Sequence, residues 1–243
     1  MKNKTVIITG GSKGLGKSII EGFIETGDYN ICTLSRKKTK FIEDNLKKYP
    51  NSFYYESIDV SNRDNLKKFV DNVYKKFGQI DILINNVGVA FDGILMTQSN
   101  DQIDTMIDVN LKSLIYQTKY VIRKMILKGK GKIINISSIV GLSGYRGLTV
   151  YSSTKAAIDG FTRSLAREMG SKNIHVNSIA PGFLETEMSQ NLSDNQLRQI
   201  KRRTPLGRLG LPRDVVPMLL FLCSDDANFI TGQTFVIDGG ITV

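Results

Sequence analysis

The stretch VIITGGSKGLG, residues 6–16, is the strongest indication of the fold of this chain. Its apolar, β-branched start at residues 6–8 predicts a buried strand. A glycine-rich turn follows at once, and apolar residues then recur at helical spacing as far as Gly27. A strand, a glycine-rich turn and a helix in this order form the context in which a dinucleotide is bound. The stretch therefore predicts a dinucleotide-binding unit at the start of the chain.

Three glycines of this turn have separate physical tasks. Gly10 permits the tight turn, because glycine adopts backbone conformations that other residues avoid. Gly14 and Gly16 let the backbone approach a pyrophosphate and let helix and strand pack closely. The start of the helix supplies N–H donors for the anion. We expect the cofactor to be bound here by Gly10, Ser12, Lys13, Gly14, Leu15 and Gly16.

The residues after the second predicted strand, 30–34, bear on the choice of cofactor. A dinucleotide fold often places a carboxylate there, which binds the ribose 2′-hydroxyl. Here Ser35 takes that place, and the cations of residues 36–38, led by Arg36, follow. A carboxylate would repel a 2′-phosphate, whereas these cations, together with Lys13, would attract one. The pattern favours NADP(H) over NAD(H); the alternative is an ordinary basic helix start.

Strand-like runs alternate with helical segments along the whole chain. The further strands are expected at residues 52–58, 81–84, 132–136, 174–179 and 234–237. Such alternation predicts a parallel sheet covered by helices on both faces. The predicted fold class is α/β: one single-domain, Rossmann-like, doubly wound parallel sheet of about seven strands flanked by helices, spanning residues 1–243. Ligands of such sheets bind at the carboxyl ends of the strands, where Asp59 and Asn86 fall.

Three expectations concern segments between strands. Residues 101–128 are expected to form one long helix, with Asn110, a mediocre helix former, inside it. Ser61 is the expected N-cap of the helix before that, since Asp64 follows three residues later. Residues 183–206 are polar and are expected to be irregular, which is typical of a mobile lid.

The motif YSSTK, residues 151–155, carries the clearest chemistry. Tyr151 and Lys155 lie four residues apart in a helical segment, so their side chains share one face. A fixed cation beside a phenol favours the phenolate, which predicts a tyrosine pKa below the usual value of about 10. Such a tyrosine can donate or accept a proton near neutral pH. The alternative for this motif alone is a solvated lysine one turn from a surface tyrosine.

The composition narrows the function classes. The net charge is +10, from 33 basic and 23 acidic residues. Such a charge is compatible with binding to nucleic acid, to a membrane surface or to an acidic or phosphorylated ligand. The basic residues are scattered without interleaved aromatics, which disfavours nucleic-acid binding. Two cysteines and one histidine offer no metal site and no histidine-based triad. The start lacks a signal peptide and residues 215–223 are too short to cross a bilayer, so a cytoplasmic protein is expected.

Several motifs together resemble the short-chain dehydrogenase/reductase superfamily. They are TGGSKGLG (9–16), NNVG (85–88), Asn110, Ser138, YSSTK (151–155) and PGFLET (181–186). Within the superfamily the chain is most similar to the 3-oxoacyl-(acyl-carrier-protein) reductases. That similarity is carried by INISSIVGLSG (134–144), SLAREMGSKNIHVNSIAPGFLETEM (164–188), TPLGRLGLPRDV (204–215) and FITGQTFVIDGG (229–240).

The resemblance implies a catalytic tetrad of Asn110, Ser138, Tyr151 and Lys155. In this scheme a hydride passes from NADPH to a ketone carbon while Tyr151 protonates the developing alkoxide. Ser138 hydrogen-bonds the same oxygen. Lys155 lowers the tyrosine pKa and binds the nicotinamide ribose, and Asn110 holds a water that links Lys155 to solvent.

The resemblance also implies further contacts and an assembly. The expected cofactor contacts beyond the glycine turn and Arg36 are Asp59, Val60, Asn86, Gly88, Tyr151, Lys155, Pro181, Gly182, Phe183, Leu184 and Thr186. Lys128, Lys130 and Lys172 stand where such reductases carry basic residues that meet the acidic acyl-carrier protein. The long central helices would pair across subunits to give a homotetramer.

Two departures leave the substrate open. Val87 stands where the family usually has alanine, and residues 90–100 (AFDGILMTQSN) are less typical of the carrier-protein reductases. The leading hypothesis is NADPH-dependent reduction of a 3-oxoacyl thioester, linked to acyl-carrier protein, to the 3-hydroxyacyl thioester. The alternatives are an NADP-dependent reductase of another ketone (a polyene or polyketide-like acyl chain, a sugar or a small secondary alcohol), a cofactor-sensing protein without turnover, and a nucleic-acid binder suggested by charge alone.

Overall fold

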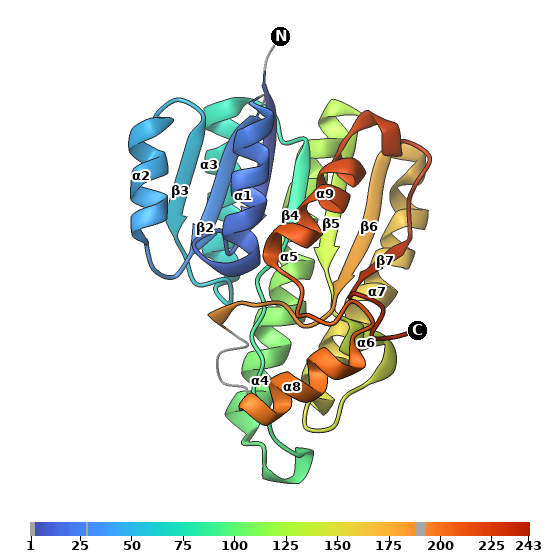
Figure 1. Cartoon of the computed structure of the whole chain (residues 1–243). Coiled ribbons are helices and arrows are strands. Elements are labelled where there is room, and N and C mark those ends of the chain that lie inside the picture. Colours follow the sequence, from blue (N-terminus) through green and yellow to red (C-terminus); the bar gives the residue numbers. More distant parts are fainter. Residues whose placement is uncertain (1–2, 28, 188–192) are drawn as a thin grey trace.

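The structure, a computed structural model of the chain, describes residues 3–27, 29–187 and 193–243. Its centre is a seven-stranded, fully parallel sheet with the order β3-β2-β1-β4-β5-β6-β7 (Figure 1). The strands are β1 (Lys4–Thr9), β2 (Tyr29–Ser35), β3 (Phe53–Ser57), β4 (Ile82–Asn85), β5 (Gly131–Ile136), β6 (Ile174–Pro181) and β7 (Thr234–Ile237). The predicted Rossmann-like α/β fold is confirmed.

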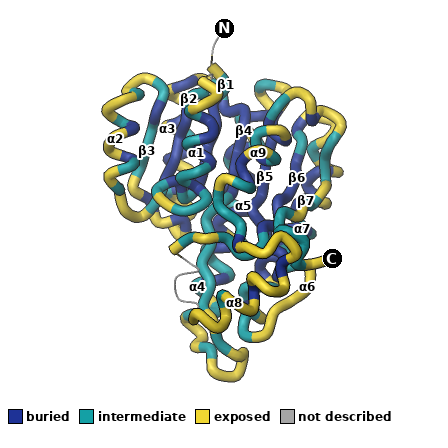
Figure 2. Tube along the Cα trace, viewed as in Figure 1, coloured by how far each residue is buried: buried dark blue, intermediate teal, exposed yellow. Residues whose placement is uncertain are grey.

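Helices cover both faces of the sheet, so the strands are buried on both sides (Figure 2). Side chains alternate along each strand: Val6 and Ile8 pack into one core, and Ile7 into the other. The first core is closed by α1 (Gly14–Thr26), α2 (Lys40–Lys48) and α9 (Pro212–Cys223). The second is closed by α3 (Arg63–Phe77), α5 (Ser113–Lys128) and α7 (Thr149–Met169).

The chain order reverses between β1 and β4, which are neighbours in the sheet. Successive strands run outward from β1 to β3 and then, from β4, outward in the other direction. Such a switch point opens a crevice at the carboxyl ends of the strands. Further helices lie beneath this edge in Figure 1. They are α4 (Asn100–Ile107), α6 (Ile139–Ser143) and α8 (Asp194–Arg203). Single turns complete the fold at η1 (Leu95–Thr97), η3 (Gly170–Lys172) and η5 (Asp225–Ala227).

The long helix expected at residues 101–128 is continuous but not uniform. It consists of α4, a π-helical turn at Asp108–Lys112 and then α5. A π-turn widens the helix by one residue and is often found at functional sites. Asn110 lies in this turn and is fully buried. The sequence therefore predicted the extent of the helix, but not the irregular turn that carries its asparagine.

The N-cap predicted for α3 was wrong by one residue. Asn62 caps the helix, since its side-chain oxygen accepts hydrogen bonds from the backbone of Asp64 and Asn65, both at 3.1 Å. The Ser61 hydroxyl donates instead to Asp59 at 2.8 Å. The Asp59 carboxylate accepts both this hydroxyl and the Ser61 N–H, the latter at 3.0 Å, so the serine side chain is turned toward Asp59 and away from the helix start.

The lid segment predicted as irregular contains a helix. Residues 188–192 lie outside the described residues, but α8 occupies the stretch after them. Ser193 caps this helix and exchanges hydrogen bonds with Gln196, and Ile200 is its buried anchor. The expectation was wrong here because a single apolar contact suffices to dock an otherwise polar helix. The role of residues 183–206 as a lid stays a prediction.

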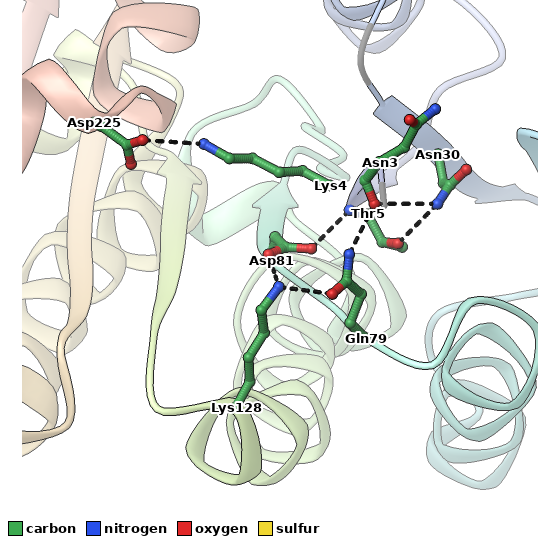
Figure 3. A network of polar contacts seen from close by, with 8 residues as sticks. All are labelled: Asn3, Lys4, Thr5, Asn30, Gln79, Asp81, Lys128 and Asp225. Atoms are coloured by element: carbon green, nitrogen blue, oxygen red, sulfur yellow. Dashed lines mark hydrogen bonds and ion pairs between the residues drawn. The ribbon is translucent and has the colours of Figure 1, made fainter. Parts of the chain in front are cut away.

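A polar network fixes the opposite, amino-terminal edge of the sheet (Figure 3). Asp81 accepts the backbone N–H of Thr5 at 2.8 Å and forms an ion pair with Lys128 at the end of α5. Lys128 also donates to Gln79 at 2.9 Å, and Gln79 donates to the Asn3 carbonyl at 2.8 Å. These contacts join β1, the start of β4 and α5 away from the crevice.

Candidate active site

The YSSTK motif lies on α7 at the carboxyl edge of the sheet. The Lys155 ammonium is 5.6 Å from the centre of the Tyr151 ring, which confirms that the two side chains share a helix face. Lys155 is 3% exposed and donates a hydrogen bond to the Ile136 carbonyl at the end of β5, at 2.8 Å. The cation is therefore held between helix and sheet rather than solvated, which removes the alternative interpretation of the motif.

Ser138 follows β5 directly and is the N-cap of α6. Its hydroxyl oxygen accepts the backbone N–H of Val140 at 3.4 Å. The Ser138 side chain lies close enough to the Tyr151 phenol to lower the pKa of that phenol. A phenol and a hydroxyl therefore meet at one point, where both can contact a single oxygen of a ligand.

Asn110 joins the site from the π-turn. Its side-chain oxygen accepts the Val89 N–H at 2.8 Å, and its amide donates to the Val89 carbonyl at 2.9 Å and to the Thr154 hydroxyl at 3.1 Å. A methyl group added at Gly88 would lie 3.4 Å from the Lys155 ammonium and 3.6 Å from the Asn110 oxygen. The structure thus brings the four residues of the predicted tetrad together; their catalytic roles stay a prediction.

The acid–base state of this pair differs from the expectation. Burial raises the pKa of Tyr151 to about 12, against a smaller lowering by the Ser138 hydrogen bond. Burial also lowers the pKa of Lys155 to about 8, against a smaller raising by Asp159. The predicted lowering of the tyrosine pKa by its lysine was wrong, because desolvation of the phenolate dominates. The phenol keeps its proton at neutral pH, as a proton donor must.

The glycine turn has the shape of a phosphate cradle. Gly10 and Gly14 adopt φ values of 72° and 53°, in the left-handed region that favours glycine. A methyl group at Gly16 would lie 2.2 Å from the Gly10 carbonyl and 2.7 Å from the Asn86 amide. The Asn86 amide in turn donates to the Thr9 carbonyl at 2.9 Å, and this bond connects the residue after β4 to the end of β1. The start of α1 is thereby left open to an anion, so these residues fit a dinucleotide.

The cations predicted to bind a 2′-phosphate lie beyond the carboxyl end of β2. Arg36 is exposed there and contributes to lowering the pKa of Asp59, for which the Ser61 N–H bond is the largest cause. Lys13 forms an ion pair with Glu187, which belongs to the segment after β6. The remaining predicted contacts along this edge are Ser12 and Leu15 in the turn and helix start, the buried Val60 after β3, and Gly88 after β4.

The cofactor contacts predicted at residues 181–186 begin at the end of β6. Pro181 is the last residue of that strand, and a methyl group at Gly182 would lie 2.8 Å from the Asp238 backbone, so the chain passes closely over the end of β7. The Phe183 ring packs edge-on against Tyr145, with centres 5.7 Å apart. Leu184 pairs with Gly210, and the Thr186 side chain lies 3.7 Å from the methyl position of Gly14. The segment therefore reaches from the sheet end to the glycine turn.

A family model described as enoyl-(acyl carrier protein) reductase matches residues 10–242. The chain belongs to this short-chain dehydrogenase/reductase family. Among its relatives, the 3-oxoacyl-(acyl-carrier-protein) reductase FabG of Chlamydia pneumoniae is 42% identical and covers 98% of this chain and 97% of its own length. FabG of Thermotoga maritima is 36% identical over 100% of this chain and 99% of its own length.

The fold agrees with that of a solved member of the same reductase fold. The structure of ElxO with NADP bound superposes with a TM-score of 0.90 at 34% sequence identity, and the match covers 98% of each chain. Because the match covers 98% of this chain, the likeness concerns the whole fold and not the nucleotide-binding half alone.

Two polar residues of this reductase site were not singled out from the sequence. Thr154 accepts a hydrogen bond from Asn110, and Asp159 is a buried carboxylate one helical turn beyond Lys155. The signal was present: Asp159 lies four residues after Lys155 and seven before the apolar Ala166 on α7, so it shares their buried helix face. A charge at a core-facing position indicates a buried partner.

The described parts of this reductase are residues 3–27, 29–187 and 193–243. Within these ranges, no helix combines the length and the apolar character that crossing a membrane requires. Within the same ranges, no group of three or more histidine, cysteine, aspartate or glutamate side chains is arranged to hold a metal ion.

Proposed function

We propose that this protein is an NADPH-dependent reductase that converts a 3-oxoacyl thioester, linked to acyl-carrier protein, into the 3-hydroxyacyl thioester. The observation that carries the proposal is the meeting of the Tyr151 phenol, the Ser138 hydroxyl and the buried Lys155 at the end of β5. The reaction adds a hydride to the ketone carbon and a proton to its oxygen. When bound, NADPH supplies the hydride.

The chain's own residues supply the rest of the chemistry. Tyr151 holds its proton at neutral pH and is placed to donate it to the oxygen on which negative charge develops. Ser138 directs a second hydrogen bond to the same oxygen, which stabilises the charge as it forms. Lys155 brings a positive charge under both groups, and Asn110 fixes the backbone of Val89 and the start of α7 around them.

The substrate class rests on the relatives, since fold and site geometry do not determine it. The relatives at 36–42% identity are named 3-oxoacyl-(acyl-carrier-protein) reductases, whereas the matching family model carries the name of an enoyl reductase. The two reactions differ in the bond reduced, a ketone C=O or a C=C. A hydroxyl beside a proton-donating phenol suits an oxygen that becomes an alkoxide, and therefore favours the ketone.

A substrate panel with NADPH tests this function. The expected result is rapid NADPH oxidation with a carrier-bound 3-oxoacyl thioester, slower oxidation with acetoacetyl-CoA, and little with crotonyl-CoA or a sugar ketone. Preference for the enoyl thioester, or for the sugar, would replace the substrate class but keep the reductase. Tight NADPH binding without turnover on any member would instead support a cofactor-sensing protein.

Cofactor choice gives a separate prediction. Arg36→Asp should shift the preference from NADPH toward NADH by roughly tenfold or more, because an exposed carboxylate beside Asp59 would repel a 2′-phosphate. The ratio of kcat/KM for the two cofactors measures this. Lys47→Asp, which makes the same charge reversal at an exposed position in the last turn of α2, is the matched control. An unchanged ratio in Arg36→Asp would assign the phosphate to Lys13, once released from Glu187.

The lysines predicted to meet an acidic carrier protein lie away from this crevice. Lys128 is engaged by Asp81 and Gln79 at the amino-terminal edge (Figure 3). Lys130 and Lys172 precede β5 and β6 and so stand at the same edge. Within one chain they are at the opposite end of the sheet from Tyr151. Their docking role stays a prediction, and it would require a neighbouring subunit's crevice nearby.

We place the carrier on α8 instead. This helix has four exposed cations, for which the described residues show no ion pair: Arg198, Lys201, Arg202 and Arg203. The chain after α8 returns to the crevice, where the Leu206 N–H donates to the Gly239 carbonyl at 3.2 Å. Leu206 itself is 69% exposed. A basic helix beside an apolar rim fits an acidic protein that delivers an acyl chain.

Charge reversal tests this surface. Arg198→Glu with Arg202→Glu should raise KM for the carrier-linked substrate by roughly tenfold, while kcat and the KM for an uncharged small 3-oxoacyl thioester stay unchanged. The matched control, Lys47→Glu with Lys68→Glu, reverses two exposed lysines on α2 and α3. If Lys130→Glu with Lys172→Glu gave the effect and the α8 pair did not, the carrier would dock at the amino-terminal edge.

Three further expectations belong to this proposal. The assembly is a homotetramer in which the long central helices, α4 and α5, pair between subunits, and the protein acts in the cytoplasm. Residues 1–243 form one dinucleotide-binding and catalytic domain with a lid at 183–206. The homotetramer depends on the family resemblance, whereas the cytoplasmic location and the single domain depend on the sequence pattern.

A further inference from the structure

Asp159 is a buried carboxylate behind the proposed active site. It lies on α7 and is 2% exposed. Three hydroxyl groups donate to it: Ser137 after β5 at 2.9 Å, Ser178 on β6 at 2.7 Å and Thr234 on β7 at 3.2 Å. One side chain therefore joins α7 to three neighbouring strands, β5, β6 and β7.

Packing alone does not account for this residue. Removing a carboxylate from water is unfavourable unless hydrogen bonds replace its hydration, and a leucine would fill the same space between helix and sheet without that demand. Three hydroxyl donors stabilise the charged form of the carboxyl group. The chain thus keeps a negative charge at this position and places hydroxyl donors around it.

The cation that this charge faces is Lys155. The two residues are four apart on α7, so their side chains lie on one face of the helix. Around Lys155 the described residues contribute neutral groups: the Ile136 carbonyl and the Asn110 amide from other elements, and the Tyr151 phenol from α7 itself. Among the described residues, Asp159 is the acid that raises the pKa of Lys155, against the lowering by burial.

We propose that Asp159 is a positioning residue that keeps Lys155 protonated and fixes it against the strand ends during ketone reduction. It does so through Lys155 and touches neither substrate nor cofactor. The inference rests on the proposed function. Loss of Asp159 should change the pH range over which the reductase is active. Loss of a purely structural contact would instead change the stability by the same amount at every pH.

Asp159→Asn removes the charge and keeps the hydrogen-bonding shape. Ser178 and Thr234 can still donate to the amide oxygen, and Ser137 can accept from the amide while it donates to the Lys155 carbonyl, 3.2 Å away. We expect the alkaline limb of kcat/KM to move about one pH unit lower than in the wild type. Ser178→Ala is the control: it removes one hydrogen bond but not the charge, so its limb should stay in place.

A second readout needs no turnover. The pKa of Lys155 in the folded protein, about 8, lies below the ordinary lysine value, so the unfolded chain binds the extra proton and Lys155 contributes a rise in stability with pH above about 8. In Asp159→Asn this rise should begin about one pH unit lower. It is measured from the unfolding free energy of the ligand-free protein between pH 6 and about pH 10.

The outcomes separate this inference from the proposed function. In Asp159→Asn, an alkaline limb of kcat/KM and a rise in stability that both begin at a lower pH than in the wild type support the role of Asp159. An onset and an alkaline limb that coincide with the wild type would make Asp159 a structural contact, even if the reductase activity stands. Absence of activity in the wild type would overturn the proposed function, while the stability measurement would still decide the effect on Lys155. Asp159→Ser, smaller but polar, makes the same prediction should Asp159→Asn fail to fold.

Discussion

Tyr151→Phe should bind NADPH as tightly as the wild type and lose at least ~100-fold in kcat. The substitution removes one oxygen from the site and keeps the ring, which packs near the Lys155 ammonium. Without the phenolic proton, the developing alkoxide retains the Ser138 hydrogen bond but has no acid beside it. Steady-state kinetics with a 3-oxoacyl thioester, and NADPH titration by fluorescence, measure the two quantities.

Tyr145→Phe provides the matched control for the loss of a phenolic hydroxyl. Tyr145 lies in the loop before α7 and contacts Phe183 through its ring, so its oxygen can be removed with the ring contact kept. It should retain nearly full activity. If Tyr151→Phe also retained most of its kcat, Tyr151 would not be the proton donor.

Gly16→Ala should weaken NADPH binding by roughly 5- to 150-fold, the equivalent of about 1–3 kcal/mol of steric strain. The added methyl group would lie 2.2 Å from the Gly10 carbonyl oxygen, a backbone atom that cannot rotate away. The start of α1 and the glycine turn must therefore separate, and the turn loses the close approach on which pyrophosphate binding depends. Calorimetric titration of NADPH gives the dissociation constant.

Gly170→Ala makes the same chemical change where there is room for it. No atom lies within 4 Å of the methyl position there, and the residue has a helical φ of −57°. This variant should bind NADPH normally. Wild-type affinity in Gly16→Ala would mean that the cofactor does not depend on this turn, and the site would have to be sought elsewhere in the crevice.

The parts of the fold that could be predicted are those set by local pattern. The run at residues 234–237 is β7 as expected, and residues 6–8 lie in β1, because β-branched apolar runs specify strands over a few residues. The spacing of Tyr151 and Lys155 fixed a shared helix face, since helical geometry depends on sequence separation alone.

The parts that could not be predicted depend on contacts between distant segments. The π-turn around Asn110 is stabilised by hydrogen bonds to Val89 and Thr154, which are 21 and 44 residues away in the chain. The proton affinity of Tyr151 depends on its burial in the folded chain, and local spacing gave the wrong direction for its pKa. Asp159 acquires its hydroxyl partners only when β5, β6 and β7 come together.

The most direct test of the central claim follows the fate of one hydride. NADPH carrying deuterium at the transferable position of the nicotinamide is incubated with the wild-type protein and a carrier-bound 3-oxoacyl thioester, and the product is analysed by mass spectrometry. One deuterium on the C3 carbon that bears the new hydroxyl group is the predicted result. A 3-hydroxyacyl product without deuterium at C3, or an unreduced ketone with NADPH unconsumed, would contradict it.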